Sequence, residues 1–131
     1  MSFIRRTGTS EFKVYPSAGT IAAGAAVQFD ENGEVVAAAT AKAIVGVAVA
    51  AATSSTNCTI DINHPGDEWV VDVTTGTMAA DEIGEEADLE TSTGATLTES
   101  NNDLLIVGWD GVSTGKAYVQ FMKSYQTTIA A

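Results

Sequence analysis

The chain has 131 residues, 45% of them hydrophobic, which is enough for one globular domain and excludes a wholly disordered chain. Its formal net charge of −11 argues against a nucleic-acid-binding protein, because phosphate contacts need lysine and arginine side chains. The hydrophobic residues are mostly alanine and valine, which bury little area each, so we expect added stabilisation from an oligomer or a bound partner.

The first ten residues predict a flexible N-terminal arm, since they are polar apart from Phe3 and Ile4 near the tip. Arg5 and Arg6 follow, and a free arm with apolar and arginine side chains is typical of a segment that docks on a partner. No apolar run follows the two arginines, so we expect no secretory signal and synthesis in a cytoplasm. We assign residues 1–13 to the arm, 14–123 to a single β domain and 124–131 to a polar C-terminal tail.

A small β cassette spans residues 18–50, with a short strand at 27–29, a turn at 30–33 and a returning strand at 34–36. Residues 35–52 are apolar enough to suggest a helix or a membrane span as alternatives to a strand at 43–50. Lys42 and Gly46 disfavour both alternatives, because a membrane charge and a mid-helix glycine each cost free energy. The alternation of valine with small residues instead predicts a buried strand.

A second copy of this cassette spans about 75–109, which predicts a duplicated domain. The repeat aligns Gly19–Ala23 with Gly76–Ala80 at the opening, and it places Asp81 where Gly24 stands in the first copy. The turn glycines Gly33 and Gly94 form the second match, and Gly46 and Gly108 form the closing match.

Further segments predict strands at 11–15, 58–62, 68–73, 104–109 and 116–123, and polar and apolar residues alternate in 11–15, 58–62 and 116–123. Residues 81–90 hold six acidic side chains and predict a helical turn or a long loop, with a solvated face or an oxygen-ligand calcium site as its two readings. Short strands with turns at this spacing predict an all-β fold, a small sandwich or a barrel-like domain with an extended N-terminal arm.

No catalytic constellation is visible, and we predict neither an enzyme nor a cofactor or metal site. His64 is the one histidine and lies in a proline–glycine turn, while Cys58 is the one cysteine, so disulfides and cysteine clusters are excluded within the chain. The segment Gly111–Lys116 departs from the phosphate-loop spacing and precedes a strand. Trp69 and Trp109 lie in strands, where tryptophan serves the core or a subunit interface.

The cassette GTIAAGAAVQFDENGEVV, with the later AIVGVAV, resembles a family of small tailed-phage proteins called decoration, cement or head-stabilising proteins. The segments DEWVVDV, LIVGWD and AYVQF continue the resemblance over about residues 14–123. It implies a small β-rich fold and a homotrimer seated on the capsid exterior at local three-fold sites, where the arm reaches the major capsid protein. The expected capsid contacts are then Phe3, Ile4, Arg5, Arg6 and Lys13, with Trp69 and Trp109 at the subunit interface.

Two other functions stay open at this point. One is a receptor- or glycan-binding β module, such as a head fibre or an adhesion domain, that would use the tryptophan surfaces and the acidic loop. The other is a small trimeric enzyme that uses the carboxylates of 81–90. The resemblance and the absence of a nucleophile–base pair both favour the structural virion protein, with no membrane or nucleic-acid partner.

Overall fold

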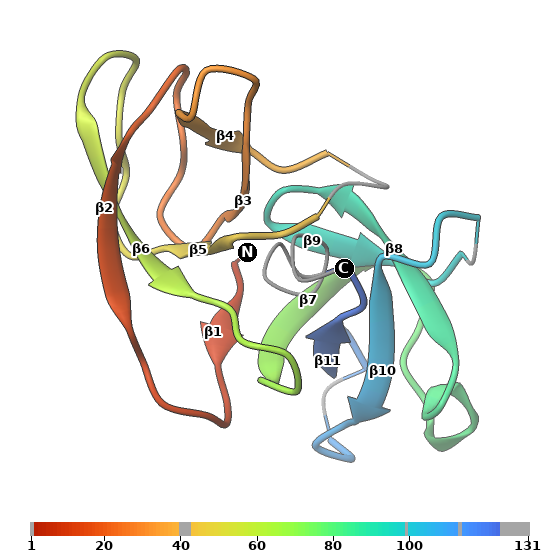
Figure 1. Cartoon of the computed structure of the whole chain (residues 1–131). Coiled ribbons are helices and arrows are strands. Elements are labelled where there is room, and N and C mark those ends of the chain that lie inside the picture. Colours follow the sequence, from red (N-terminus) through yellow and green to blue (C-terminus); the bar gives the residue numbers. More distant parts are fainter. Residues whose placement is uncertain (1, 40–42, 99, 113, 124–131) are drawn as a thin grey trace.

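The structure, a computed structural model, describes residues 2–39, 43–98, 100–112 and 114–123 (Figure 1). These residues form strands and one 3-10 helix, with no membrane-length apolar helix among them. In chain order the elements are β1 (Ile4–Arg5), β2 (Phe12–Pro16), β3 (Ala26–Phe29), β4 (Val35–Ala37), β5 (Gly46–Ala48), β6 (Asn57–Ile62), β7 (Trp69–Thr75), η1 (Ala80–Glu82), β8 (Glu86–Thr91), β9 (Gly94–Thr96), β10 (Leu104–Gly108) and β11 (Lys116–Phe121). The predicted all-β fold is therefore confirmed, and the strand over 43–50 forms as β5.

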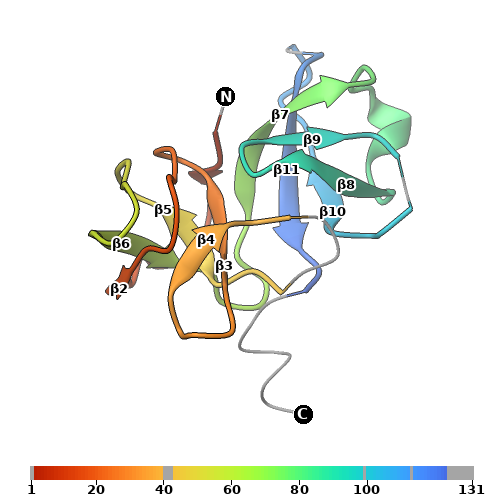
Figure 2. The same cartoon turned by 90° about the horizontal axis from the view of Figure 1, so that it is seen from above.

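The chain is built as two barrel-like halves with one topology, which Figures 1 and 2 show side by side. The first half has the strand order β2-β6-β5-β3-β4, and the second has β7-β11-β10-β8-β9 in the corresponding places. A parallel pairing closes each half: β7 pairs with β9, and Ser17 at the end of β2 bridges Val35 in β4. The duplication thus extends beyond the predicted three-strand cassette to five strands.

The openings of the two cassettes are equivalent in the structure as they are in the sequence. Ile21 and Met78 are both fully buried. Each donates its backbone N–H to a carbonyl in the loop before the last strand of its half, Ile21 to Ala52 and Met78 to Thr114. The apolar residue that follows Gly-Thr therefore occupies an equivalent buried position in each half.

The predicted match of Gly46 with Gly108 is wrong. Gly46 pairs with Ile62 near the end of β6, while Leu104 pairs with Phe121 at the end of β11. Leu104, not Gly108, is thus the counterpart of Gly46. Gly108 lies at a register shift in β10, so the shared Ile-Val-Gly letters reflect similar composition rather than the same position.

The acidic segment 81–90 is only partly the turn or loop that its composition predicts. Residues 80–82 form the single turn of η1, but 86–91 form β8, a central strand of the second half. Gly84, not Asp81, corresponds to Gly24: both have positive φ, and both donate their N–H to the neighbouring strand, Gly84 to Ile106 and Gly24 to Ala48. The residues before Gly84 are therefore the insertion that lengthens the second copy.

Asp88 is a buried acidic residue in the interior of β8, and its carboxylate is satisfied by hydrogen bonds. Its carboxylate accepts hydrogen bonds from the backbone N–H groups of Ser100, Asn101 and Asn102 and from the Thr98 hydroxyl, at 2.8–3.1 Å. Burial opposes its ionisation, but these hydrogen bonds outweigh the burial and hold the pKa of Asp88 below its ordinary value. The carboxylate thus fixes the loop that leads into β10.

Replacement of Asp88 by Asn is expected to cost about 1–3 kcal/mol at pH 7, because the amide is a weaker acceptor and brings an unwanted donor. The pKa of Asp88 is lower in the folded state, so its carboxylate stabilises the fold above its unfolded pKa, and this contribution disappears as the pH falls through the folded value. Denaturant unfolding between pH 7 and pH 3 should therefore show the gap between wild type and Asp88→Asn shrinking with acid. Glu31→Gln, at an exposed turn, is the control; an equal pH response of both variants would contradict the role of Asp88.

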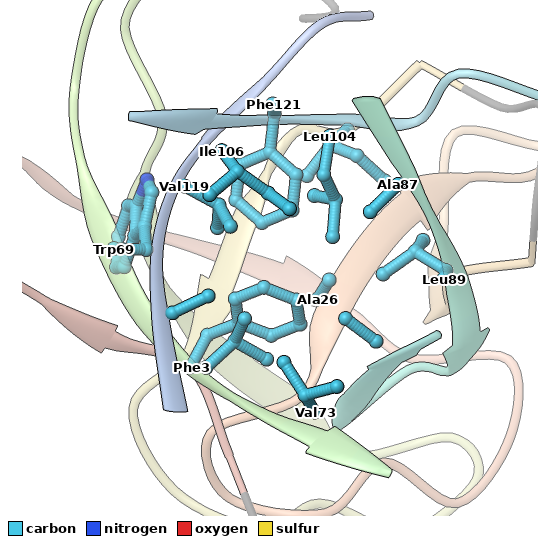
Figure 3. Packing of buried hydrophobic residues seen from close by; sticks show 14 of the residues in the cluster. Phe3, Ala26, Trp69, Val73, Ala87, Leu89, Leu104, Ile106, Val119 and Phe121 are labelled. Carbon is cyan, nitrogen blue, oxygen red and sulfur yellow. The ribbon is translucent and has the colours of Figure 1, made fainter. Parts of the chain in front are cut away.

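Two apolar clusters make up the core. One fills the first half with small side chains such as Val27, Val35 and Ile60. The other fills the second half and also takes in residues of the first half, among them Ala26 and Val47 (Figure 3). The two halves therefore share buried surface, and the junction between them is part of the core.

Candidate functional site

The N-terminal segment, residues 2–11, lies against the body instead of projecting as a free arm. The side chain of Phe3 is 2% exposed, and its ring lies 5.0 Å from that of Phe121 in the shared core (Figure 3). β1 pairs with the start of β7, and the Phe3 N–H donates to Gly24. The sequence predicts a free arm because nothing in its first ten residues shows that Phe3 packs against Phe121, at the far end of the domain in sequence.

Arg5 fixes this segment to the junction of the two halves. Its guanidinium donates to Asp61 at 2.9 Å, to Asp67 at 2.8 Å and to the Ile62 carbonyl at 2.8 Å. The same group lies 4.5 Å from the centre of the Trp69 ring. Burial lowers the pKa of Arg5, but the hydrogen bonds that Arg5 donates to Asp61 and Asp67 outweigh it and raise the pKa above its ordinary value. We call Arg5, Asp61 and Asp67 the junction cluster.

The other two predicted basic contacts, Arg6 and Lys13, differ in how closely they interact with other side chains of the chain. Arg6 pairs with Glu68 and lies 4.1 Å from the centre of the Tyr118 ring, so it also holds the segment down. Lys13 is exposed, and its ammonium lies 3.9 Å from a Glu11 carboxylate oxygen. Lys13 is therefore the most available cation of the predicted contact set.

The two tryptophans have different surroundings. Trp69 is 1% exposed and donates its indole N–H to Asn63 at 2.9 Å, so its ring serves the core beneath Arg5 and offers nothing to a second subunit. This corrects its placement at a subunit interface. Trp109 is partly buried against the same core, and its role at an interface stays a prediction.

An exposed apolar surface lies beside the junction cluster. Ile4, Phe12, Val14 and Val49 are each 51–62% exposed, and we call these four residues the β2 face. The strand register places them together: Phe12 lies opposite Asp61, Val14 lies opposite Thr59, and Val49 donates its N–H to Thr59. A groove lined by Ile4, Phe12 and Val49 runs between β1 and the first half. Of the four, only Ile4 was a predicted contact.

The alternation of 11–15 contained the signal for Phe12 and Val14. The alternation predicts a half-buried strand, and the apolar side of such a strand is expected in the core. In the structure Phe12 and Val14 face outward, whereas Tyr15 packs against the core of the first half. Without the position of the neighbouring strands, the alternation alone gives the period but not which face is covered.

Within 2–39, 43–98, 100–112 and 114–123, no group of three or more His, Cys, Asp or Glu side chains is placed to hold a metal ion. The His64 ring contacts Glu11 at 2.6 Å and Asp67 at 3.4 Å, next to the junction cluster. Cys58 is buried in the first half, and burial raises the pKa of its thiol, which suppresses the reactive thiolate.

Comparison with known proteins gives a match to a protein family. The family model described as phage cement protein matches residues 3–64, which include the junction cluster residues Arg5 and Asp61 and the whole β2 face. No curated protein matches the chain. The predicted resemblance to cement proteins is confirmed over this segment, which spans the N-terminal segment and the first half.

Proposed function

We propose that the chain, which is similar to phage cement proteins over residues 3–64, has a structural, capsid-associated role, and that it binds the outer surface of the shell as a homotrimer and stabilises the lattice of the major capsid protein. The observation that supports this proposal best is the β2 face within the matched segment. Exposed apolar side chains rimmed by charged groups are typical of protein-binding surfaces.

The proposed contact differs in detail from the free arm expected from the sequence. Ile4 and Lys13 stay in the contact set, and Phe12, Val14 and Val49 join them, since all are exposed. Phe3 and Arg5 act indirectly, because their side chains hold β1 beside the groove. Arg6 is engaged by Glu68 and contributes in the same indirect way.

The homotrimer would multiply a modest contact. The three β2 faces of one trimer would engage several capsid subunits at once, so the effective concentration for the second and third contacts is high. A protein that binds the assembled lattice and not its free subunits stabilises the lattice by mass action. The exterior position, and synthesis in the host cytoplasm before assembly, follow from the same proposal.

Phe12→Asp is expected to lower the affinity for capsids at least tenfold, because it places a charge in the middle of the apolar contact. Co-sedimentation with capsids of the phage that encodes the protein, together with the melting temperature of the decorated shell, measures the effect. Val112→Asp is the matched control, since Val112 is 86% exposed on a loop of the second half. Equal capsid binding by both variants would contradict the proposal that the β2 face contacts the capsid. A monomer bound to the shell would contradict the proposed trimer.

The receptor- or glycan-binding alternative loses its main surface. It relied on both tryptophans as ring platforms, and the Trp69 ring is buried beneath Arg5. Residues 86–91 of the acidic segment form a strand, which shortens the loop that the alternative also needed.

A further inference from the structure

The internal duplication reveals a strand position that is filled in the second half and open in the first. In the second half Val119 pairs with Trp69, and in the first half Ile60 pairs with Lys13 in the corresponding place. Val14 in β2 is therefore the counterpart of Val70 in β7. Val70 pairs with Ile4 of β1, whereas Val14 has no strand on its outer side among the described residues.

The backbone groups on this open edge can be identified from the hydrogen bonds of the opposite edge. Ile62 donates to Glu11 and Ser17 donates to Thr56, so the odd-numbered residues of this stretch point their N–H and C=O groups at β6. In an antiparallel pair the alternate residues point the other way. Phe12 and Val14 thus direct their backbone groups away from β6, and no described residue accepts or donates there.

The counterpart edge shows what such groups can bind. On β7 the Glu68 carbonyl, the counterpart of Phe12, accepts from the Arg6 N–H, and Val70 pairs with Ile4. A short, extended segment thus completes the second half. The first half offers the same backbone geometry with exposed Phe12 and Val14 side chains beside it.

We propose that an extended segment of the capsid protein adds as an antiparallel strand to the free edge of β2, at Phe12 and Val14, in the place that β1 occupies on β7. The inference rests on the proposed function and specifies how its contact is made. Main-chain hydrogen bonds give such an added strand its affinity, and the flanking side chains select it.

A second copy of this chain fits the edge poorly. A two-fold pairing that joins Phe12 of one copy with Val14 of the other places Lys13 opposite Lys13, and like charges directly opposite destabilise a strand pair. A shift toward the C-terminal end brings Pro16, which has no N–H, into a pairing position.

The charges favour a partner strand that carries a carboxylate opposite Lys13. The nearest acid to the Lys13 ammonium among the described residues is Glu11 at 3.9 Å, and both side chains are about half exposed. The groove beside Ile4 and Phe12 offers space for an apolar side chain of the same strand. The expected segment is therefore extended and apolar, with an acidic residue at the central position.

Val14→Pro tests the edge directly, because it removes an outward N–H and leaves the inward N–H groups of Lys13 and Tyr15 in place. It should lower capsid affinity at least tenfold. Val14→Thr is the comparison variant, since it keeps the N–H and the β-branched shape, and it should lose clearly less capsid affinity than Val14→Pro. Equal binding by Val14→Pro, with an unchanged melting temperature, would overturn the proposal.

Residue-resolved hydrogen exchange on wild type decides the case even if Val14→Pro fails to fold. The Phe12 and Val14 amides should exchange rapidly in the free protein and at least tenfold more slowly on capsids, while Lys13 and Tyr15 are slow in both. If capsids bind but Phe12 and Val14 stay fast, the added strand is wrong and the proposed function stands. If wild type does not bind capsids, both fail. If the two amides are already slow in an oligomer that Val14→Pro dissociates, a second copy occupies the edge and the proposal is overturned.

Discussion

Phe3→Ala is expected to lower the free energy of unfolding by about 3–5 kcal/mol, the cost of removing a buried phenylalanine from a packed core. The ring is 2% exposed and contacts the Phe121 ring in the cluster shared by the two halves (Figure 3). Denaturant unfolding followed by tryptophan fluorescence measures the loss, since Trp69 lies in the same cluster and its ring is 6.1 Å from that of Phe121.

Phe12→Ala is the matched control for this result. It removes the same side chain from a position that is 59% exposed, so it should change the free energy of unfolding by about 0.5 kcal/mol or less. A similar small loss for both variants would show that Phe3 does not fill the core in solution and that the N-terminal segment is free, as its sequence predicts.

This difference changes how the N-terminal segment is to be studied. Removal of residues 2–10 would take away Phe3 and Arg5 together, and the second half would lose both a core side chain and the strand that covers the start of β7. Loss of capsid binding by such a truncation would then report unfolding as readily as a lost contact. Single substitutions at exposed positions of the β2 face separate the two effects.

Most strands could be predicted because their evidence is local. β6 and β11 alternate apolar and polar residues, β7 and β10 are rich in β-branched and other apolar residues, and turns with glycine or proline separate these strands. In β11 the alternate residues Ala117, Val119 and Phe121 are all buried. β1, β8 and β9 were not predicted as strands, and in β8 the central acid is satisfied by backbone N–H groups that lie ten or more residues later.

The repeat was visible in the sequence, but its alignment needed the strand pairings. Gly19–Ala23 and Gly76–Ala80 match because Ile21 and Met78 are both buried and make equivalent backbone hydrogen bonds in the two halves. The later glycines could not be aligned by identity, since Gly108 lies at a bulge and Gly46 does not. Only the pairing of Gly46 with Ile62 and of Leu104 with Phe121 fixes the register.

The candidate site shows the same limit. The sequence identified Ile4 and Lys13 as contacts because they lie near the N-terminus, and both are exposed. It could not separate them from Phe3 and Arg5, which are neighbours in sequence but point into the body and into the junction cluster. The partners that decide this, Asp61, Asp67 and Phe121, are more than fifty residues away along the chain.

Arg5→Ala is expected to destabilise the protein by about 3–5 kcal/mol, because it leaves the Asp61 and Asp67 carboxylates without their cation in a largely buried place. The three side chains are only 11–12% exposed. Water therefore compensates little of the lost interaction, and the two carboxylates are left facing the same vacated position. Thermal and denaturant unfolding at pH 7 measure the effect.

Arg6→Ala is the control, since the Arg6 side chain is 41% exposed and its pair with Glu68 should contribute about 1 kcal/mol or less. A second change tests the cause: Asp61→Asn added to Arg5→Ala removes one of the uncompensated charges, so the double variant should lose less than the sum of the two single losses. Additive losses, or equal losses for Arg5→Ala and Arg6→Ala, would contradict a charge-based junction. In that case Phe3 alone would hold β1, and with it the groove wall of the β2 face, in place.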